Sequence, residues 1–164
     1  MISSSRALGA GMAGGVLAVA AIGLGVFLLA QQGAGPVDRP SDPASARTIA
    51  LGQVIYADNC AVCHGADLDG QPNWQTPLSS GRLPAPPHDA GGHTWHHPDE
   101  VLFDITKHGP AAIVGNDYES DMPGFEGILT DDQIGAALAY IKSTWPERER
   151  TYQQERTRQW QSQD

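Results

Sequence analysis

The sequence predicts an all-α fold, and three observations support this. Apolar residues recur at spacings of three and four in separate stretches whose ends carry helix-start or helix-stop residues. No stretch shows the alternating pattern of a convincing β-strand. The 164 residues include 19 glycines and 12 prolines, which favours short helices joined by long ordered loops over a large sheet.

The N-terminal part of the chain contains a long apolar segment. Residues 7–30 carry no charge and are numerous enough to cross the hydrocarbon core of a bilayer as a helix. The alternative is a cleaved secretory signal, although the apolar run continues well beyond the small-x-small site at residues 18–20. We therefore expect residues 1–30 to be a membrane anchor and residues 31–41, which are rich in Gly, Pro and polar side chains, to be a linker.

The first helix of the main domain is expected to begin at Asp42 and Pro43. Asp is a favoured N-cap residue, and Pro is favoured at the first helical position. The helix then runs to about Asn59. Its inner face is predicted to consist of Ile49, Gly52, Ile55 and Tyr56.

Two further helices are predicted from their caps. Pro98 opens one, which has two acids in its first turn and Gly109 as its stop signal. Thr130 and Gln133 form a capping box that opens the next, which ends before Pro146. The predicted inner faces are Val101, Leu102 and Ile105 in the former and Ile134, Leu138 and Ile141 in the latter.

These helices define one domain over residues 42–146, with two long loops at 66–97 and 109–128. Loops of this length in a small domain usually wrap a bound group or carry function. The remaining residues, 147–164, form a tail dense in charge and glutamine. We interpret this tail as a solvated helical extension.

The charge of the chain excludes some classes of partner. The formal net charge is −9, from 10 basic and 19 acidic residues. This argues against a nucleic-acid-binding protein, which needs a basic face, and against a surface built to lie on anionic lipid. Because residues 41–146 hold the acidic excess, we expect the domain to steer toward a partner with a basic docking patch.

The most specific motif is Cys60-Ala61-Val62-Cys63-His64. It contains both cysteines of the chain, three positions apart and followed at once by histidine, which is the attachment signature of c-type haem. Two thiols add to the two vinyl groups on one edge of the porphyrin, and the next imidazole then reaches the iron. Two other interpretations remain: a redox dithiol, which needs a thioredoxin-like context, and a zinc site completed by histidines.

A six-coordinate haem needs a second axial ligand, and a thioether sulfur raises its potential. Met1 is the start residue and Met12 lies in the apolar segment, so Met122 is the methionine available to the main domain. It lies in a loop before the last predicted helix. We predict Met122 as the distal ligand, with a histidine as its main competitor.

From about residue 44 to residue 145 the sequence resembles a bacterial class I cytochrome c. The resemblance rests on the pattern Gly52-x3-Tyr56-x3-Cys60-Ala61-Val62-Cys63-His64-Gly65 and on Met122-Pro123 followed by a helix with Tyr140 and Ile141. It implies a cytochrome c fold of three to four helices around one covalent haem c, with the first and last helices crossing near Gly52. It also implies His64 as proximal ligand, Met122 as distal ligand, and electron transfer outside the cytoplasm rather than enzymatic catalysis.

With residues 7–30 retained, the resemblance narrows to membrane-anchored monohaem cytochromes. It then implies a haem domain on the periplasmic side of the inner membrane, with membrane redox complexes as electron donor and acceptor. Cleavage would instead leave a soluble periplasmic carrier. Two alternatives stay open: a haem subunit of a larger oxidoreductase complex, and a gas-binding or metal-handling haem protein.

In this family a proline carbonyl commonly accepts a hydrogen bond from the proximal histidine, which fixes its ring and raises its basicity. Pro77 is our candidate, and Pro84, Pro86 and Pro87 compete with it because this loop departs from the common pattern.

The loop also contains a histidine-rich stretch between positions 88 and 97. In one interpretation it packs on the haem edge, where the N–H groups of His93 and Trp95 bond the propionates. In the other, copper or zinc binds an accessory site. The ligands of that site would be His88, His93, His96 and His97.

Overall fold

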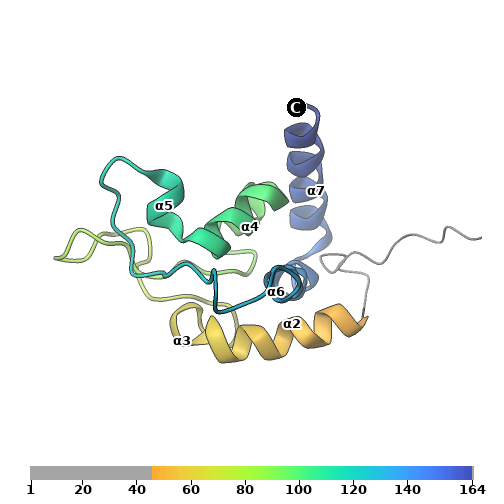
Figure 1. Ribbon diagram of the computed structural model, residues 1–164, viewed down its shortest axis with the longest axis horizontal. Coiled ribbons are helices and arrows are strands. Elements are labelled where there is room, and N and C mark those ends of the chain that lie inside the picture. The colour runs from red at the N-terminus through yellow and green to blue at the C-terminus, as the bar shows by residue number, and fades with distance from the viewer. Residues whose placement is uncertain (1–45, 164) are drawn as a thin grey trace, which may run out of the picture. The chain divides into compact units, whose positions relative to one another are not determined.

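The computed structural model describes residues 46–163, which form a helical domain without a β-strand (Figure 1). The helices are α2 (Ala46–Asn59), α3 (Ala61–His64), α4 (Asp99–His108), α5 (Pro110–Val114), α6 (Asp131–Ser143) and α7 (Glu147–Gln161), with a 3-10 turn η1 (Thr94–His96). The all-α prediction is confirmed for this part of the chain.

Several predictions concern residues outside the described range. They are the membrane anchor, the linker, and the start of the first helix at Asp42 and Pro43. None of the helices within residues 46–163 is both long enough and apolar enough to cross a bilayer.

The predicted helix caps are present. Thr130 Oγ1 accepts a hydrogen bond from Gln133 N at 3.3 Å, and Gln133 Oε1 accepts one from Thr130 N at 2.9 Å, which together form the capping box of α6. Helix α4 begins after Pro98 and ends at Gly109, whose φ of +85° lies in the left-handed region that favours glycine. Helix α5 follows at once and lies inside the segment that was predicted as a loop.

The core forms where α6 crosses α2, and Figure 1 shows α6 almost end-on above α2. A Cβ built on Gly52 would stand 1.9 Å from Ala136 O and 2.9 Å from Tyr140 Cβ. The two backbones can approach this closely because Gly52 has no side chain. The crossing that the family resemblance implies is therefore present.

The end of α6 reaches the histidine-rich stretch. Trp145, only 1% exposed, donates a hydrogen bond from Nε1 to His88 O at 2.7 Å. The buried cluster around it consists of Tyr56, Leu68, Leu102, Ile141 and Trp145.

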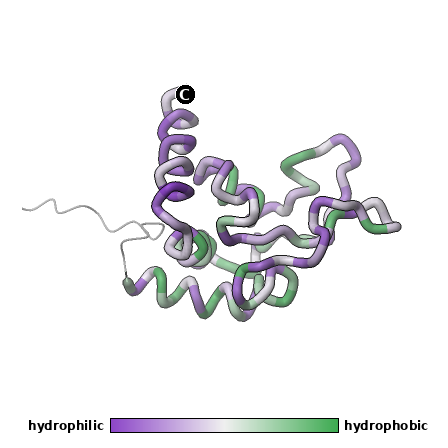
Figure 2. The backbone as a smooth tube through the Cα atoms, turned by 180° about the vertical axis from the view of Figure 1, so that it is seen from behind, coloured by the Kyte–Doolittle hydropathy of each residue, from purple (hydrophilic) through white to green (hydrophobic). Residues whose placement is uncertain are grey.

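The tail is helical, as predicted, but α7 is not simply solvated. Figure 2 shows that its residues are mostly hydrophilic, yet Glu149 and Gln153 are buried. Gln153 Nε2 donates to Asp99 Oδ1 at 2.6 Å and to His97 O at 3.3 Å. Lys142 Nζ of α6 contacts the same Asp99 carboxylate at 2.7 Å. Helix α7 therefore packs on the start of α4 through polar contacts, which a search for an apolar stripe does not find.

Replacing Gly52 tests the helix crossing. Gly52→Ala should lower the free energy of unfolding by about 1–3 kcal/mol, because the new methyl group meets the Ala136 carbonyl and the helices must separate. Denaturant titration followed by circular dichroism measures the change. Gly91→Ala is the control, because its methyl group would meet only the Asp89 side chain at 3.2 Å, and it should change stability by less than about 0.5 kcal/mol. Equal losses in both variants would contradict the crossing.

Candidate functional site

The two cysteines and His64 lie where α2 passes into α3. The helical hydrogen bonds continue through the junction: Cys60 N donates to Tyr56 O at 2.9 Å, and His64 N donates to Cys60 O at 2.9 Å. Residues three and four positions apart on a helix lie on one face, so this turn brings both thiols and the imidazole into one neighbourhood. Both thiols are free, with Cys60 half-buried and Cys63 exposed.

The ionisation of Cys60 distinguishes between two interpretations of the motif. Burial raises the pKa of the Cys60 thiol to about 11, and the neighbouring Cys63 adds to the rise. A redox dithiol instead needs a lowered pKa that yields a thiolate at neutral pH. The environment of Cys60 therefore counts against a redox dithiol and suits a sulfur that is capped in a thioether.

His64 is oriented by a single strong acceptor. Its ring is buried, and Nδ1 donates a hydrogen bond to Pro86 O at 2.8 Å. Since a carbonyl only accepts, Nδ1 carries the proton and Nε2 keeps its lone pair for a metal ion. Burial lowers the pKa of His64 and outweighs the opposing effect of the Pro86 bond, so the neutral, ligating form is favoured.

The acceptor is Pro86, and not Pro77 as predicted. Gln71 N donates to Ala85 O at 2.9 Å and Gln71 Oε1 accepts from Ala85 N at 3.0 Å, which closes the base of a loop at residues 72–84. Pro77 lies within that loop and is exposed. The loop adds residues between His64 and its acceptor, which therefore lies 22 positions further along the chain. A proline chosen by its short distance from His64 in the sequence, such as Pro77, is then the wrong one.

Tyr56 closes the turn that carries His64. Its hydroxyl donates to Gly65 O at 2.9 Å and lies 3.3 Å from His64 O. Burial is the main reason that the pKa of Tyr56 is raised above its ordinary value. The resemblance includes Tyr56 without a role, and the structure shows that its hydroxyl satisfies carbonyls at the end of the motif.

His88 lies directly beside His64. The two rings stack with centroids 4.0 Å apart and planes inclined at 24°. His88 Nδ1 lies 2.8 Å from Thr94 Oγ1, and burial holds the pKa of His88 well below its ordinary value. The sequence analysis did not anticipate this contact.

The other histidines of the stretch are dispersed. The ring of His93 stacks on that of Trp74 with centroids 5.3 Å apart. The ring of the exposed His96 packs on that of Trp95 with centroids 3.7 Å apart. Among residues 46–163, no group of three or more His, Cys, Asp or Glu side chains is arranged to hold a metal ion. The interpretation as an accessory metal site, with His88, His93, His96 and His97 as ligands, therefore finds no support there.

Two buried nitrogens in this stretch suit the other interpretation. His93 Nδ1 and Trp95 Nε1 are buried and have no hydrogen-bond partner within the described part of the chain. Buried polar atoms are normally paired, and indole N–H is a donor only. A carboxylate such as a haem propionate would satisfy them, so these residues fit the group that the motif implies.

Met122 lies in a loop whose two ends are held. Before it, Arg82 Nη1 contacts Asp121 Oδ1 at 2.5 Å, and Met122 N donates to Ser120 Oγ at 3.1 Å. After it, Phe125 N donates to Thr106 O of α4 at 3.1 Å. The half-buried Met122 thus has a defined position between the loop at 72–84 and α4.

A family model described as Cytochrome c matches residues 49–145, which is more than half of the chain. The matched region contains Cys60, Cys63, His64 and Met122 and leaves α7 outside. No curated protein and no solved structure matches the chain.

Removing the Tyr56 hydroxyl tests the closure of the turn. Tyr56→Phe should lower the free energy of unfolding by about 1 kcal/mol, because the Gly65 carbonyl loses its donor while the ring stays packed. Thermal unfolding of the full chain measures the effect. Tyr140→Phe is the matched control, since that hydroxyl makes no hydrogen bond within residues 46–163. A loss in the control equal to that in Tyr56→Phe would contradict the assigned role.

Proposed function

Since the chain belongs to the cytochrome c family and carries haem c covalently bound, we propose that it is a one-electron carrier with His64 and Met122 as axial ligands. When bound, haem c supplies reversible exchange between ferric and ferrous iron. The observation that carries the proposal is the buried His64, whose Nδ1 is bonded to Pro86 O next to two free thiols.

Each side chain of the site has a separate task. Cys60 and Cys63 attach the group, and Pro86 directs Nε2 of His64 toward the iron while raising its basicity. His93 and Trp95 offer buried N–H groups to the propionates. Met122 is the one thioether in residues 46–163, and its loop is held at both ends, which supports it as the soft distal ligand that raises the potential.

The proposal includes a membrane tether. The uncharged residues 7–30 would anchor the domain in the inner membrane, and residues 31–41 would link it to a haem domain in the periplasm. Donor and acceptor would then be redox complexes of the same membrane. Because a tether makes docking effectively intramolecular, weak affinity is sufficient for turnover.

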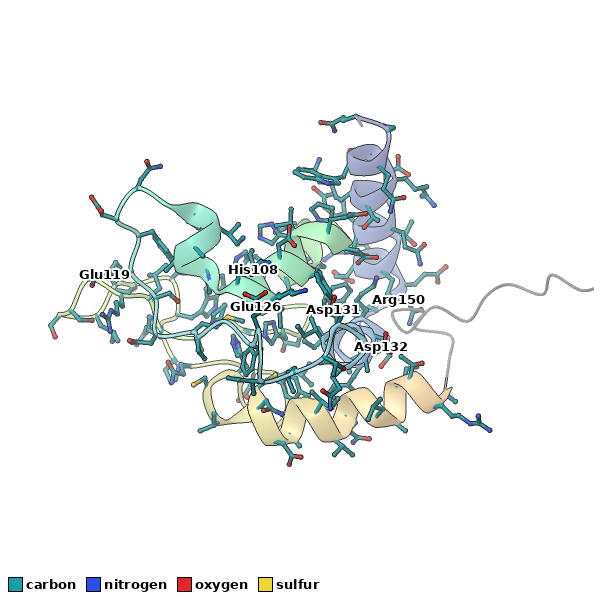
Figure 3. The ribbon with its side chains drawn as sticks, in the orientation of Figure 1. His108, Glu119, Glu126, Asp131, Asp132 and Arg150 are labelled. Carbon is teal, nitrogen blue, oxygen red and sulfur yellow. The ribbon has the colours of Figure 1, made fainter. Side chains whose placement is uncertain are left out.

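Exposed acidic side chains on both sides of Met122 in the sequence form an acidic surface that suits a basic partner. Figure 3 shows Glu126 on the segment before α6, Asp131 and Asp132 at the start of α6, and Glu119 apart from them on the loop before Met122. The side chains of Glu119, Glu126 and Asp131 are 65%, 68% and 65% exposed. Arg82 and Lys107 neutralise this surface only in part. Its field would orient a positively charged partner toward the methionine side of the site.

A second candidate function is a haem subunit of a larger complex. One observation favours it: Leu51, Val54 and Val62 are 48%, 57% and 86% exposed along α2 and α3. An apolar surface of this kind is typical of a permanent interface. The particle size after extraction in mild detergent distinguishes the two candidates, because a carrier leaves the membrane without a stable partner.

The optical spectrum tests the ligation. The ferric protein should show a low-spin spectrum with the weak far-red sulfur-to-iron band, and carbon monoxide should leave the reduced spectrum unchanged. Met122→Leu should lose that band, bind carbon monoxide and lower the midpoint potential by roughly 0.1–0.3 V, within the ~0.8 V range that axial ligands span. Ile113→Leu, at an exposed position of α5, is the control and should keep the wild-type spectrum. A high-spin wild-type spectrum that shifts with carbon monoxide would contradict a carrier and favour a gas-binding haem.

The rate of electron transfer with small charged reagents tests the acidic surface. Oxidation of the ferrous protein by a cationic ruthenium ammine should slow as salt is added, whereas oxidation by ferricyanide should speed up. Asp132→Asn combined with Glu126→Gln should slow the cationic reagent about twofold at low salt. The control with the same change in net charge is Glu147→Gln combined with Glu155→Gln on α7. Equal slowing by both pairs would show that total charge, and not this surface, directs the encounter.

A further inference from the structure

A second histidine lies on the face of the proximal one. The ring of His88 is stacked on the ring of His64, with centroids 4.0 Å apart, and it meets the Tyr56 ring edge-on at 6.2 Å. His64 therefore has two neighbours of different kinds. The carbonyl of Pro86 lies at its Nδ1 edge, and the ring of His88 covers one face.

The position of His88 is fixed on several sides. Its backbone N donates to Leu68 O at 2.8 Å, and its carbonyl accepts from Trp145 Nε1 at 2.7 Å. Its Nδ1 lies 2.8 Å from the hydroxyl of Thr94, which is only 5% exposed. Backbone and ring are both held by buried groups, so the ring of His88 is a rigid surface for whatever packs on it.

The two contacts on His64 restrict different movements. A hydrogen bond to Pro86 O fixes the direction of Nδ1 but leaves the imidazole free to turn about the line from Nδ1 to the oxygen. A rigid ring stacked on one face opposes that turning, because it would bring the two rings into overlap. The hydrogen bond and the stacked ring together define one plane for the imidazole.

We propose that His88 is a positioning residue that fixes the plane of the His64 imidazole and thereby sets the electronic state of the haem iron. This inference rests on the proposed role of His64 as proximal ligand. His88 does not touch the iron in this proposal. It acts through His64, as neighbours of metal ligands commonly do.

The direction of the effect follows from the Pro86 bond. The His88 ring also blocks tilting of the imidazole toward it, away from the line to Pro86 O. Without the ring, His64 can tilt as well as turn, and the tilt bends and weakens its bond to Pro86 O. A weaker bond makes the imidazole less basic, and a less basic imidazole stabilises ferric iron less well than a more basic one does. Loss of the ring should therefore raise the midpoint potential.

The experiment uses the full chain with its haem and four variants. His88→Leu removes the ring, His88→Phe keeps a ring without the Thr94 bond, and Thr94→Val removes the bond but keeps the histidine. The control is His108→Gln, which changes a histidine at the end of α4 that faces Glu126 and whose side chain is 38% exposed. Phe and Val preserve buried volume, so these variants remain informative if His88→Leu folds poorly.

Two readouts report on the imidazole directly. The midpoint potential measures the ligand strength, and the spread of the four haem-methyl resonances of the ferric protein depends on the orientation of the imidazole plane. His88→Leu should raise the potential and change the spread. His88→Phe and Thr94→Val both keep a ring on His64 without the Thr94 bond, so both should change the spread in the same direction as His88→Leu but by less.

The proposal is overturned if the haem-methyl spread of His88→Leu equals that of His108→Gln. It is also overturned if His88→Phe changes the spread as much as His88→Leu does. The far-red sulfur-to-iron band reports separately on Met122. Its absence from the wild-type protein would refute methionine ligation while the methyl spread still decides the role of His88.

Discussion

The hydrogen bond from His64 Nδ1 to Pro86 O is the interaction on which the rest of the site depends. It joins residues 22 positions apart, so the chain after His64 must fold back until Pro86 lies beside the His64 ring. The return is secured by backbone bonds of Gly70 N to His64 O at 2.8 Å and of His88 N to Leu68 O at 2.8 Å. The Pro86 bond fixes the tautomer of His64, and the return of the chain brings the ring of His88 onto the face of the His64 ring.

The helices provide the frame that keeps this return in place. Helix α6 touches α2 at Gly52, and its continuation places Trp145 where the indole bonds the His88 carbonyl. Helix α7 then packs on the start of α4 through Gln153 and Asp99. The histidine-rich stretch is therefore held by contacts with Trp145 after α6 and with Gln153 of α7. Helix α7 lies outside the region that matches the family.

This rigid arrangement suits haem c, whose iron gains or loses one electron with little change in the shape of the group. With His64 and Met122 as the proposed ligands, the burial of His64 and the thioether of Met122 would favour reduced iron, whereas the Pro86 bond would favour oxidised iron, and the potential would be a balance between them. Glu119, Glu126 and Asp131 are exposed, and in the proposed carrier their field would act on a partner at the surface. In our further proposal, the ring of His88 would hold the His64 imidazole in one plane and so keep this balance constant.

Much of the fold and the core of the site were predictable from sequence, because the signals are local. Helix ends follow from capping residues such as Thr130 and Gln133. The thiols that bond one edge of a porphyrin and the imidazole that reaches its iron lie close together in the chain. The choice of Pro86 over Pro77, the stacking of His88 and the packing of α7 depend on contacts between residues far apart in the chain. Only the tertiary structure decided these contacts, because the length of a loop does not define its path and polar packing leaves no periodic pattern in the sequence.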